Sequence, residues 1–123
     1  MLNILIPKEI KDGETRVAAT SETVKKLVEM GAEVVVESGA GKSSYISDDD
    51  FKQAGAKVEK DVKKAFANAD IILKVNQPVK NELDLVKDGS VWISSMVPQV
   101  ELDSIKKALD KKITLFSMNL IPR

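Results

Sequence analysis

Residues 6–20, IPKEIKDGETRVAAT, decide how the rest of the chain is organised. A short apolar run, Leu2–Ile6, leads into Pro7, which predicts a buried strand that stops at the proline. The polar loop that follows ends at Thr20, a residue type that commonly caps the start of a helix. In open α/β sheets, ligands bind where such loops leave the carboxyl ends of the strands. The loop is therefore the first place to look for a site.

Arg16 is the arginine of this loop, between Glu14-Thr15 and a small apolar run. Its planar guanidinium can donate two parallel hydrogen bonds to a carboxylate or a phosphate. The alternative is that Arg16 is a solvated loop charge or pairs with Glu14. Spacing alone favours this alternative. Arg16 is therefore a candidate ligand-binding residue only if a second functional group lies beside it.

The composition excludes several classes of function. The 123 residues fit one domain, and 19 basic residues balance 19 acidic ones, so no net charge attracts nucleic acid or an anionic membrane. The chain has no cysteine and no histidine, which removes disulfides, thiol chemistry and the commonest metal ligand. We therefore predict no metal site, and any chemistry must use carboxylates, lysines, Arg16, Arg123, Tyr45 or a bound cofactor.

No signal peptide opens the sequence, and no apolar run approaches the roughly 18 residues of a membrane helix. We expect a cytoplasmic chain without direct membrane insertion.

Strand and helix patterns alternate along the rest of the chain. This rhythm predicts a doubly wound parallel sheet with helices on both faces. Five main strands favour the flavodoxin-like order 2-1-3-4-5, with Ala56–Val58 as a brief edge strand. The strands are predicted at residues 2–6, 33–37, 70–75, 90–95 and 113–117, and the helices at 20–31, 48–55, 60–67, 81–86 and 101–111.

Lys74 is the second candidate, because it follows the apolar residues 71–73 at the carboxyl end of a central strand. The order 2-1-3-4-5 makes this strand a neighbour of the first, so Lys74 and Arg16 would share one crevice and could hold a small carboxylate. The alternative is that the lysine extends past the sheet edge into water. Ser94, Ser95 and Asn119 end other strands on the same edge and could add hydrogen bonds.

Two nucleotide-binding motifs are missing from the sequence. Residues 38–44, SGAGKSS, lack the first glycine of a P-loop because position 36 is valine, and the next helix begins only after Ser47. The sequence also contains no Gly-x-Gly-x-x-Gly dinucleotide fingerprint. We therefore expect no cofactor-binding residues in this chain, and any nicotinamide cofactor to be bound by another domain.

Five blocks of the sequence together resemble the N-terminal domain shared by alanine dehydrogenases and the alpha subunit of proton-translocating NAD(P) transhydrogenase. The blocks occur in the family's order and spacing and span nearly the whole chain. They are residues 6–9, 14–20, 36–41, 71–75 and 122–123.

The resemblance implies that residues 1–123 form a single cleft-forming N-terminal domain of a larger oxidoreductase. A separate Rossmann domain, absent from this chain, would bind NAD(H), and the domain alone would be inactive. In alanine dehydrogenases the residues matching Arg16 and Lys74 hold the carboxylate and carbonyl of pyruvate or alanine. A histidine completes that site, and the matching position here is Val97, which departs from the pattern.

Two segments resemble the transhydrogenase branch more closely: residues 74–78, KVNQP, and residues 121–123. There hydride passes between NADH and NADP⁺ bound on different subunits, and the resemblance assigns no fixed role to Arg16 and Lys74. It also implies a homodimer, with NADP-binding and membrane subunits as partners. Two alternatives remain open: the substrate domain of an alanine dehydrogenase-like enzyme, and a flavodoxin-like interaction module without catalysis.

Overall fold

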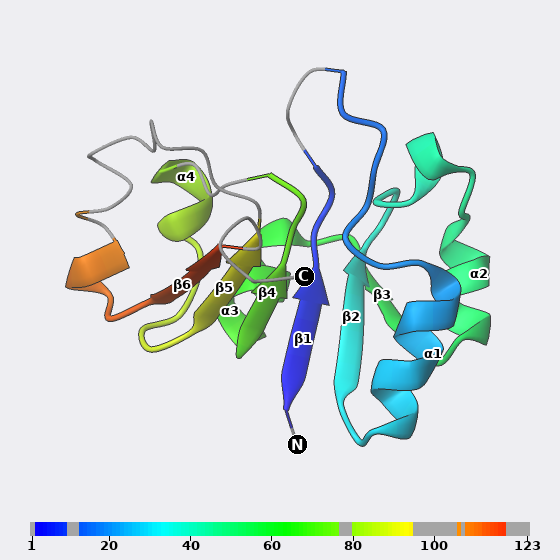
Figure 1. The fold of residues 1–123 in the computed structure, drawn as a ribbon, viewed down its shortest axis with the longest axis horizontal. Helices are drawn as coiled ribbons and strands as arrows, with labels where there is room; N and C mark the ends of the chain where they lie inside the picture. The colour runs from blue at the N-terminus through cyan, green and yellow to red at the C-terminus, as the bar shows by residue number, and fades with distance from the viewer. Residues whose placement is uncertain (1, 10–12, 77–79, 95–105, 107, 118–123) are drawn as a thin grey trace.

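The computed structural model describes residues 2–9, 13–76, 80–94, 106 and 108–117. Its centre is strand β1 (Asn3–Ile6), which pairs in parallel with β2 (Glu33–Glu37) on one side and with β4 (Ile71–Leu73) on the other. Beyond β4 lie β5 (Val91–Ser94) and β6 (Thr114–Ser117), also parallel. These five strands have the predicted order 2-1-3-4-5 (Figure 1).

The predicted number of five strands was wrong by one. The brief edge strand is β3 (Lys57–Glu59), and it extends the sheet to six strands in the order β3-β2-β1-β4-β5-β6. Three residues of β3 pair in parallel with the outer side of β2, which satisfies backbone groups that would otherwise face solvent. Val58 is the one apolar residue of β3, so the sequence carries little strand signal there.

Two helix starts follow the caps predicted from the sequence. The Thr20 side chain accepts a hydrogen bond from the backbone of Thr23, and Ser47 forms a reciprocal capping box with Asp50. The described helices are α1 (Ser21–Glu29), the 3₁₀ turn η1 (Lys42–Ser44), α2 (Asp48–Gln53), α3 (Val62–Asn68) and α4 (Lys80–Leu83).

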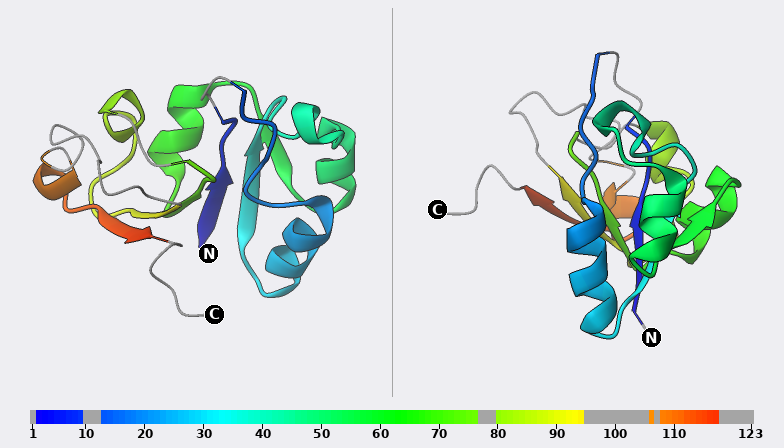
Figure 2. Two further views of the ribbon diagram at one scale, coloured as in Figure 1. Left: turned by 45° about the horizontal axis from the view of Figure 1, so that its top comes forward. Right: turned by 90° about the vertical axis from the view of Figure 1, so that its right-hand side faces the viewer.

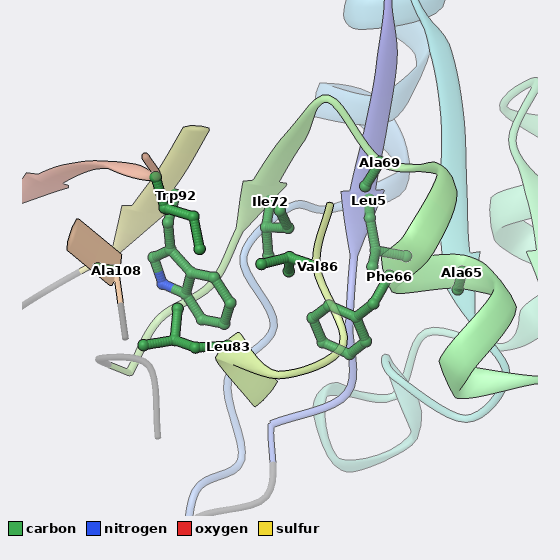
Figure 3. Close-up of a cluster of buried hydrophobic side chains, with 10 residues drawn as sticks. Leu5, Ala65, Phe66, Ala69, Ile72, Leu83, Val86, Trp92 and Ala108 are labelled. Carbon is green, nitrogen blue, oxygen red and sulfur yellow. The ribbon is translucent and has the colours of Figure 1, made fainter. Parts of the chain in front are cut away.

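Hydrophobic cores lie on both faces of the sheet, because alternate strand residues point to opposite sides. Ile6 packs with Val24 of α1 and Phe51 of α2 on one face. Leu5 belongs to the other core, in which the Phe66 and Trp92 rings stack with centroids 6.3 Å apart (Figure 3). Helices therefore cover both faces, as predicted, and Figure 2 shows them on either side of the strands.

Some sequence predictions lie outside the described residues: Ser95, Val97, Asn119, residues 121–123 and most of the helix at 101–111. Of that helix, residues 106 and 108–110 are described and are helical, with Ala108 buried. Among the helices that the structure describes, none combines the length and apolar character that crossing a membrane requires.

Candidate functional site

The loops that follow β1 and β4 lie side by side at the carboxyl edge of the sheet. Ile4 pairs with Ile71 and Leu5 with Ile72, so the two strands end next to each other. The two loops are joined through side chains that are far apart in sequence. We call the six residues involved the rim network: Glu9, Glu14, Arg16, Lys74, Asn76 and Glu82.

Glu9 fastens the loop after β1 to the loop after β4. Its side chain is only 2% exposed, and Oε2 accepts a hydrogen bond from the backbone N–H of Val75 at 2.9 Å. Oε1 accepts from the backbone N–H and from the side-chain Nδ2 of Asn76, both at 3.1 Å. Three donors from one loop therefore converge on one buried carboxylate of the other.

Lys74 is buried at the end of β4, with its side chain 1% exposed. Nζ donates to both oxygens of Glu82 on α4, at 2.9 and 2.7 Å, and lies 3.8 Å from Oε1 of Glu9. The same ammonium lies 5.7 Å from the centroid of the Trp92 ring, within range of a cation–π interaction. The alternative in which Lys74 extends into water was therefore wrong.

Arg16 is 69% exposed and pairs with Glu14, which is the alternative that the spacing of the two residues favoured. Nε and Nη2 donate to the two carboxylate oxygens at 2.9 and 2.8 Å, which is the bidentate geometry of a strong pair. Hydrogen bonds from Arg16 lower the pKa of the Glu14 carboxyl from its usual 4.5 to about 2. The same contact raises the pKa of Arg16.

Asn76 connects the two cation–carboxylate pairs. Its Nδ2 donates to Oε1 of Glu14 at 3.0 Å and to Oε1 of Glu9 at 3.1 Å. Arg16 and Lys74 thus belong to one hydrogen-bonded network at one edge of the sheet, but each cation already has a carboxylate partner. With three carboxylates and two cations, the rim network carries a formal negative charge.

Glu37 adds a fourth carboxyl group at the same edge, at the end of β2. It is buried, and its Oε2 accepts a hydrogen bond from the backbone N–H of Lys8 at 2.8 Å. Burial is the main cause that raises the pKa of this carboxyl, and the negative charge of Glu82 acts in the same direction.

The sequence pattern pointed to the two cations and not to the four polar residues near them at the same edge: Glu9, Glu37, Asn76 and Glu82. Glu9 and Asn76 are 67 residues apart, so no local spacing joins them. Their place at strand ends was a usable signal, since Glu9 follows β1 and Asn76 follows β4. Ser94 was named as a residue that could add hydrogen bonds at this edge; its buried Oγ accepts one from Nε1 of Trp92 at 3.1 Å.

The glycine-containing loop at residues 38–44 binds a carboxylate of the chain itself. Asp48 accepts from Oγ of Ser38 at 2.7 Å and from the backbone N–H of Gly39 at 2.9 Å. Donors that a phosphate would need are thereby used by the first residue of α2. A P-loop requires backbone N–H groups that are free to bind phosphate oxygens. The occupied donors of this loop therefore agree with the sequence, which lacks the P-loop motif.

Together the fold and the rim network define a doubly wound α/β domain whose polar residues gather at the carboxyl ends of its central strands. The family model for the alanine dehydrogenase/PNT N-terminal domain matches residues 5–123. The chain belongs to this family.

Curated relatives include oxidoreductases of both branches. The chain is 38% identical to the first part of NAD(P) transhydrogenase subunit alpha from Rhodospirillum rubrum, over 99% of this chain and 33% of that protein. It is 40% identical to alanine dehydrogenase of Methanococcus maripaludis, over 89% of this chain and 29% of that protein. The chain thus spans about a third of the length of these relatives.

Solved structures similar to this chain also include members of both branches. The transhydrogenase from Sinorhizobium meliloti superposes with a TM-score of 0.91 and 39% identity, over 98% of this chain and 36% of that one. An L-alanine dehydrogenase superposes with a TM-score of 0.87 and 29% identity, over 94% and 32% of the two chains.

Proposed function

We propose that residues 1–123 act as the outer, cleft-forming N-terminal domain of the NAD(H)-binding alpha subunit of a proton-translocating NAD(P) transhydrogenase. In that reaction NADH gives a hydride to NADP⁺, which yields NAD⁺ and NADPH. The similarity to transhydrogenases over nearly the full chain supports this assignment.

The buried Lys74–Glu82 pair is the observation that carries the proposal. A 2-oxo acid is an anion, and a site that holds it needs cations with donors to spare. Lys74 is shielded from solvent and donates to both oxygens of Glu82, while the fork of Arg16 is occupied by Glu14. Hydride transfer between two nicotinamide rings requires no such cation, because the cofactors supply the chemistry.

A second candidate is the substrate domain of an alanine dehydrogenase-like enzyme. The identity to alanine dehydrogenases and the exposure of the Arg16 side chain favour it. In this case Arg16 would hold the substrate carboxylate, and Lys74 would have to leave Glu82 to reach the carbonyl.

NAD(H) would be bound mainly by a domain other than this one. Among the described residues at the carboxyl edge, the buried groups include Glu9, Glu37 and Glu82, and carboxylates do not fit the pyrophosphate of a dinucleotide. Titration of this chain with NADH in a calorimeter should therefore give no binding in the micromolar range. A micromolar affinity would contradict the proposal that another domain binds NAD(H).

The assembly proposed is a homodimer that works with NADP-binding and membrane subunits on the cytoplasmic side of a membrane. The name of the Rhodospirillum rubrum relative describes it as a subunit, which supports a multi-subunit setting. Within this proposal the chain itself contacts protein partners and enters neither the membrane nor a nucleic-acid complex.

The deciding experiment uses the product of the complete gene together with its NADP-binding partner. We expect hydride transfer from NADH to NADP⁺ and no reduction of NAD⁺ when alanine is supplied. Reduction of NAD⁺ that depends on alanine and is abolished by Arg16→Ala would establish the second candidate instead. Lys26→Ala, which changes a solvated lysine of α1, is the matched control.

A further inference from the structure

The short helix α4 carries two buried residues with different partners. Both carboxylate oxygens of Glu82 accept hydrogen bonds from Nζ of Lys74, at 2.9 and 2.7 Å. Leu83 is fully buried in the core that contains Trp92 (Figure 3). A helix of four residues has too few hydrogen bonds of its own to be stable alone. Contacts with the rest of the chain must therefore fix its orientation, and with it the position of Glu82 beside Lys74.

Lys111 binds the segment that directly follows α4. Its Nζ donates to the backbone carbonyl of Asp84 at 2.8 Å and to that of Val86 at 2.9 Å. A lysine in this position satisfies carbonyls at the C-terminal end of a helix, where a positive charge is also favourable. The carbonyl of Lys111 in turn accepts from the backbone N–H of Gly89 at 2.9 Å. One residue thus holds the chain after α4 at three points.

These hydrogen bonds can fix a rotation that the apolar core leaves open. Burial of Leu83 is non-directional, so it holds α4 against the core without setting the rotation of the helix about its own axis. Hydrogen bonds are directional, and those donated by an ammonium are stronger than neutral ones. The accepting carbonyls follow Glu82 closely in the chain. A rotation that moved Glu82 away from Lys74 would therefore also pull these carbonyls from Lys111.

We propose that Lys111 is a positioning residue, which keeps the Glu82 carboxylate on Lys74 by holding the chain after α4. The inference rests on the proposed function, because the buried Lys74–Glu82 pair is what separates the two candidate functions. It deepens that proposal by naming the contact that controls whether the Lys74 ammonium stays enclosed. Without this contact, α4 turns more often and the ammonium of Lys74 meets solvent.

Hydrogen exchange of the Lys74 ammonium provides the test. In the wild-type chain this side chain is 1% exposed and paired with Glu82, so we expect its ammonium protons to exchange slowly with water. In Lys111→Met, which keeps an unbranched side chain but has no donor, we expect exchange to be about tenfold faster or more. ¹⁵N NMR of the lysine ammonium groups, assigned through the carbon atoms of each side chain, measures the rate.

Three further variants separate positioning from stability. Lys111→Arg keeps a cation with several donors and should restore slow exchange. Lys112→Met changes the neighbouring exposed lysine and is the matched control, with exchange as in the wild type. Ser47→Ala removes the cap of α2, which packs in the opposite core, so it shows what a loss of stability alone does to the exchange of Lys74.

Two outcomes would overturn the proposal. The first is a Lys111→Met variant that is folded by circular dichroism and exchanges the Lys74 protons at the wild-type rate. The second is equally fast exchange in Lys111→Met and Ser47→Ala, since Lys111 would then act on stability alone.

If Lys111→Met fails to fold, Lys111→Gln keeps neutral donors on a shorter side chain. Exchange should again be faster than in the wild type, and an unchanged rate would refute the proposal. The measurement needs neither cofactor nor partner, so its failure leaves the hydride-transfer assay unaffected.

Discussion

Lys74 and Lys26 both pair with a glutamate, but the two pairs differ in burial. Lys74→Met would leave the buried carboxylate of Glu82 without its ammonium, so we expect a loss of about 3–5 kcal/mol in the free energy of unfolding. Lys26→Met removes a solvated pair on α1 and should cost about 0.5 kcal/mol or less. Urea unfolding of the two variants measures the difference, and similar losses would show that burial of Lys74 has no energetic role.

The buried carboxyl of Glu37 should make stability depend on pH. Because burial raises its pKa in the folded chain, the folded state keeps this proton to higher pH than the unfolded state does. Its contribution therefore favours folding at low pH and weakens as pH rises from the usual value of 4.5 towards the raised one.

Glu37→Gln removes this titration and can keep the hydrogen bond from Lys8. We expect the variant to gain stability over the wild type as pH rises above 4.5, and the gain to level off once the wild-type carboxyl is ionised. Urea unfolding over a pH series measures the gap. A gap that shrinks as pH rises would contradict the assigned direction of the pKa.

Much of the candidate site could not be predicted from single residues. Arg16 was identifiable because its guanidinium stands in the loop that follows the first strand, and Lys74 because a cation at a strand end is unusual in an apolar context. Their partners were not, since Glu9 and Asn76 meet only after β1 and β4 have paired. The spacing of Glu14 and Arg16 favoured a solvated or paired Arg16, but the bidentate contact and the third residue that joins it, Asn76, depend on side-chain geometry.

At the scale of elements, the start of α2 offers a direct test. The Ser47 side chain accepts from the backbone of Asp50, and the Asp50 side chain accepts in return from the backbone of Ser47. Ser47→Ala should lower the free energy of unfolding by about 1 kcal/mol. Ser47→Asp should lower it by much less, because aspartate is also a good N-cap residue. Equal losses in thermal and urea unfolding would mean that the cap is not what stabilises this helix start.

The elements themselves were largely readable from the sequence. Thr20 and Ser47 marked helix starts, and the apolar runs marked the strands β1, β2, β4, β5 and β6, because those signals are local. Strand β3 was harder, since a three-residue strand with one apolar side chain depends on β2 for its existence. The helix predicted at residues 81–86 is α4 at residues 80–83, where a four-residue helix has little periodicity to read.

At the scale of the whole molecule, the described helices and loops cover the two faces of the sheet unevenly. On the face that carries α1, the alternate residues Ile71, Leu73, Val91 and Ile93 are partly buried, and Phe116 of β6 is 52% exposed. Parallel sheets are normally covered on both faces. An apolar strip of this kind favours self-association.

We therefore expect the chain to dimerise as its concentration rises, and Phe116→Ser to weaken the dimer by about tenfold. Sedimentation velocity at several concentrations measures the effect. Leu109→Ser is the matched control, because Leu109 is also exposed but lies on the helix whose Ala108 packs into the opposite core. Dimerisation that is equally strong in Phe116→Ser would place the contact elsewhere.

Trp92 is the single tryptophan of the chain, it is fully buried, and its ring lies beside the ammonium of Lys74. The protein thus carries its own optical reporter, because the indole emits from a site in direct contact with the end of β4. Any event that moves Lys74 away from the ring should change the intrinsic fluorescence without an added label. The emission of one residue can thereby distinguish a change at the carboxyl edge from one at a distant surface.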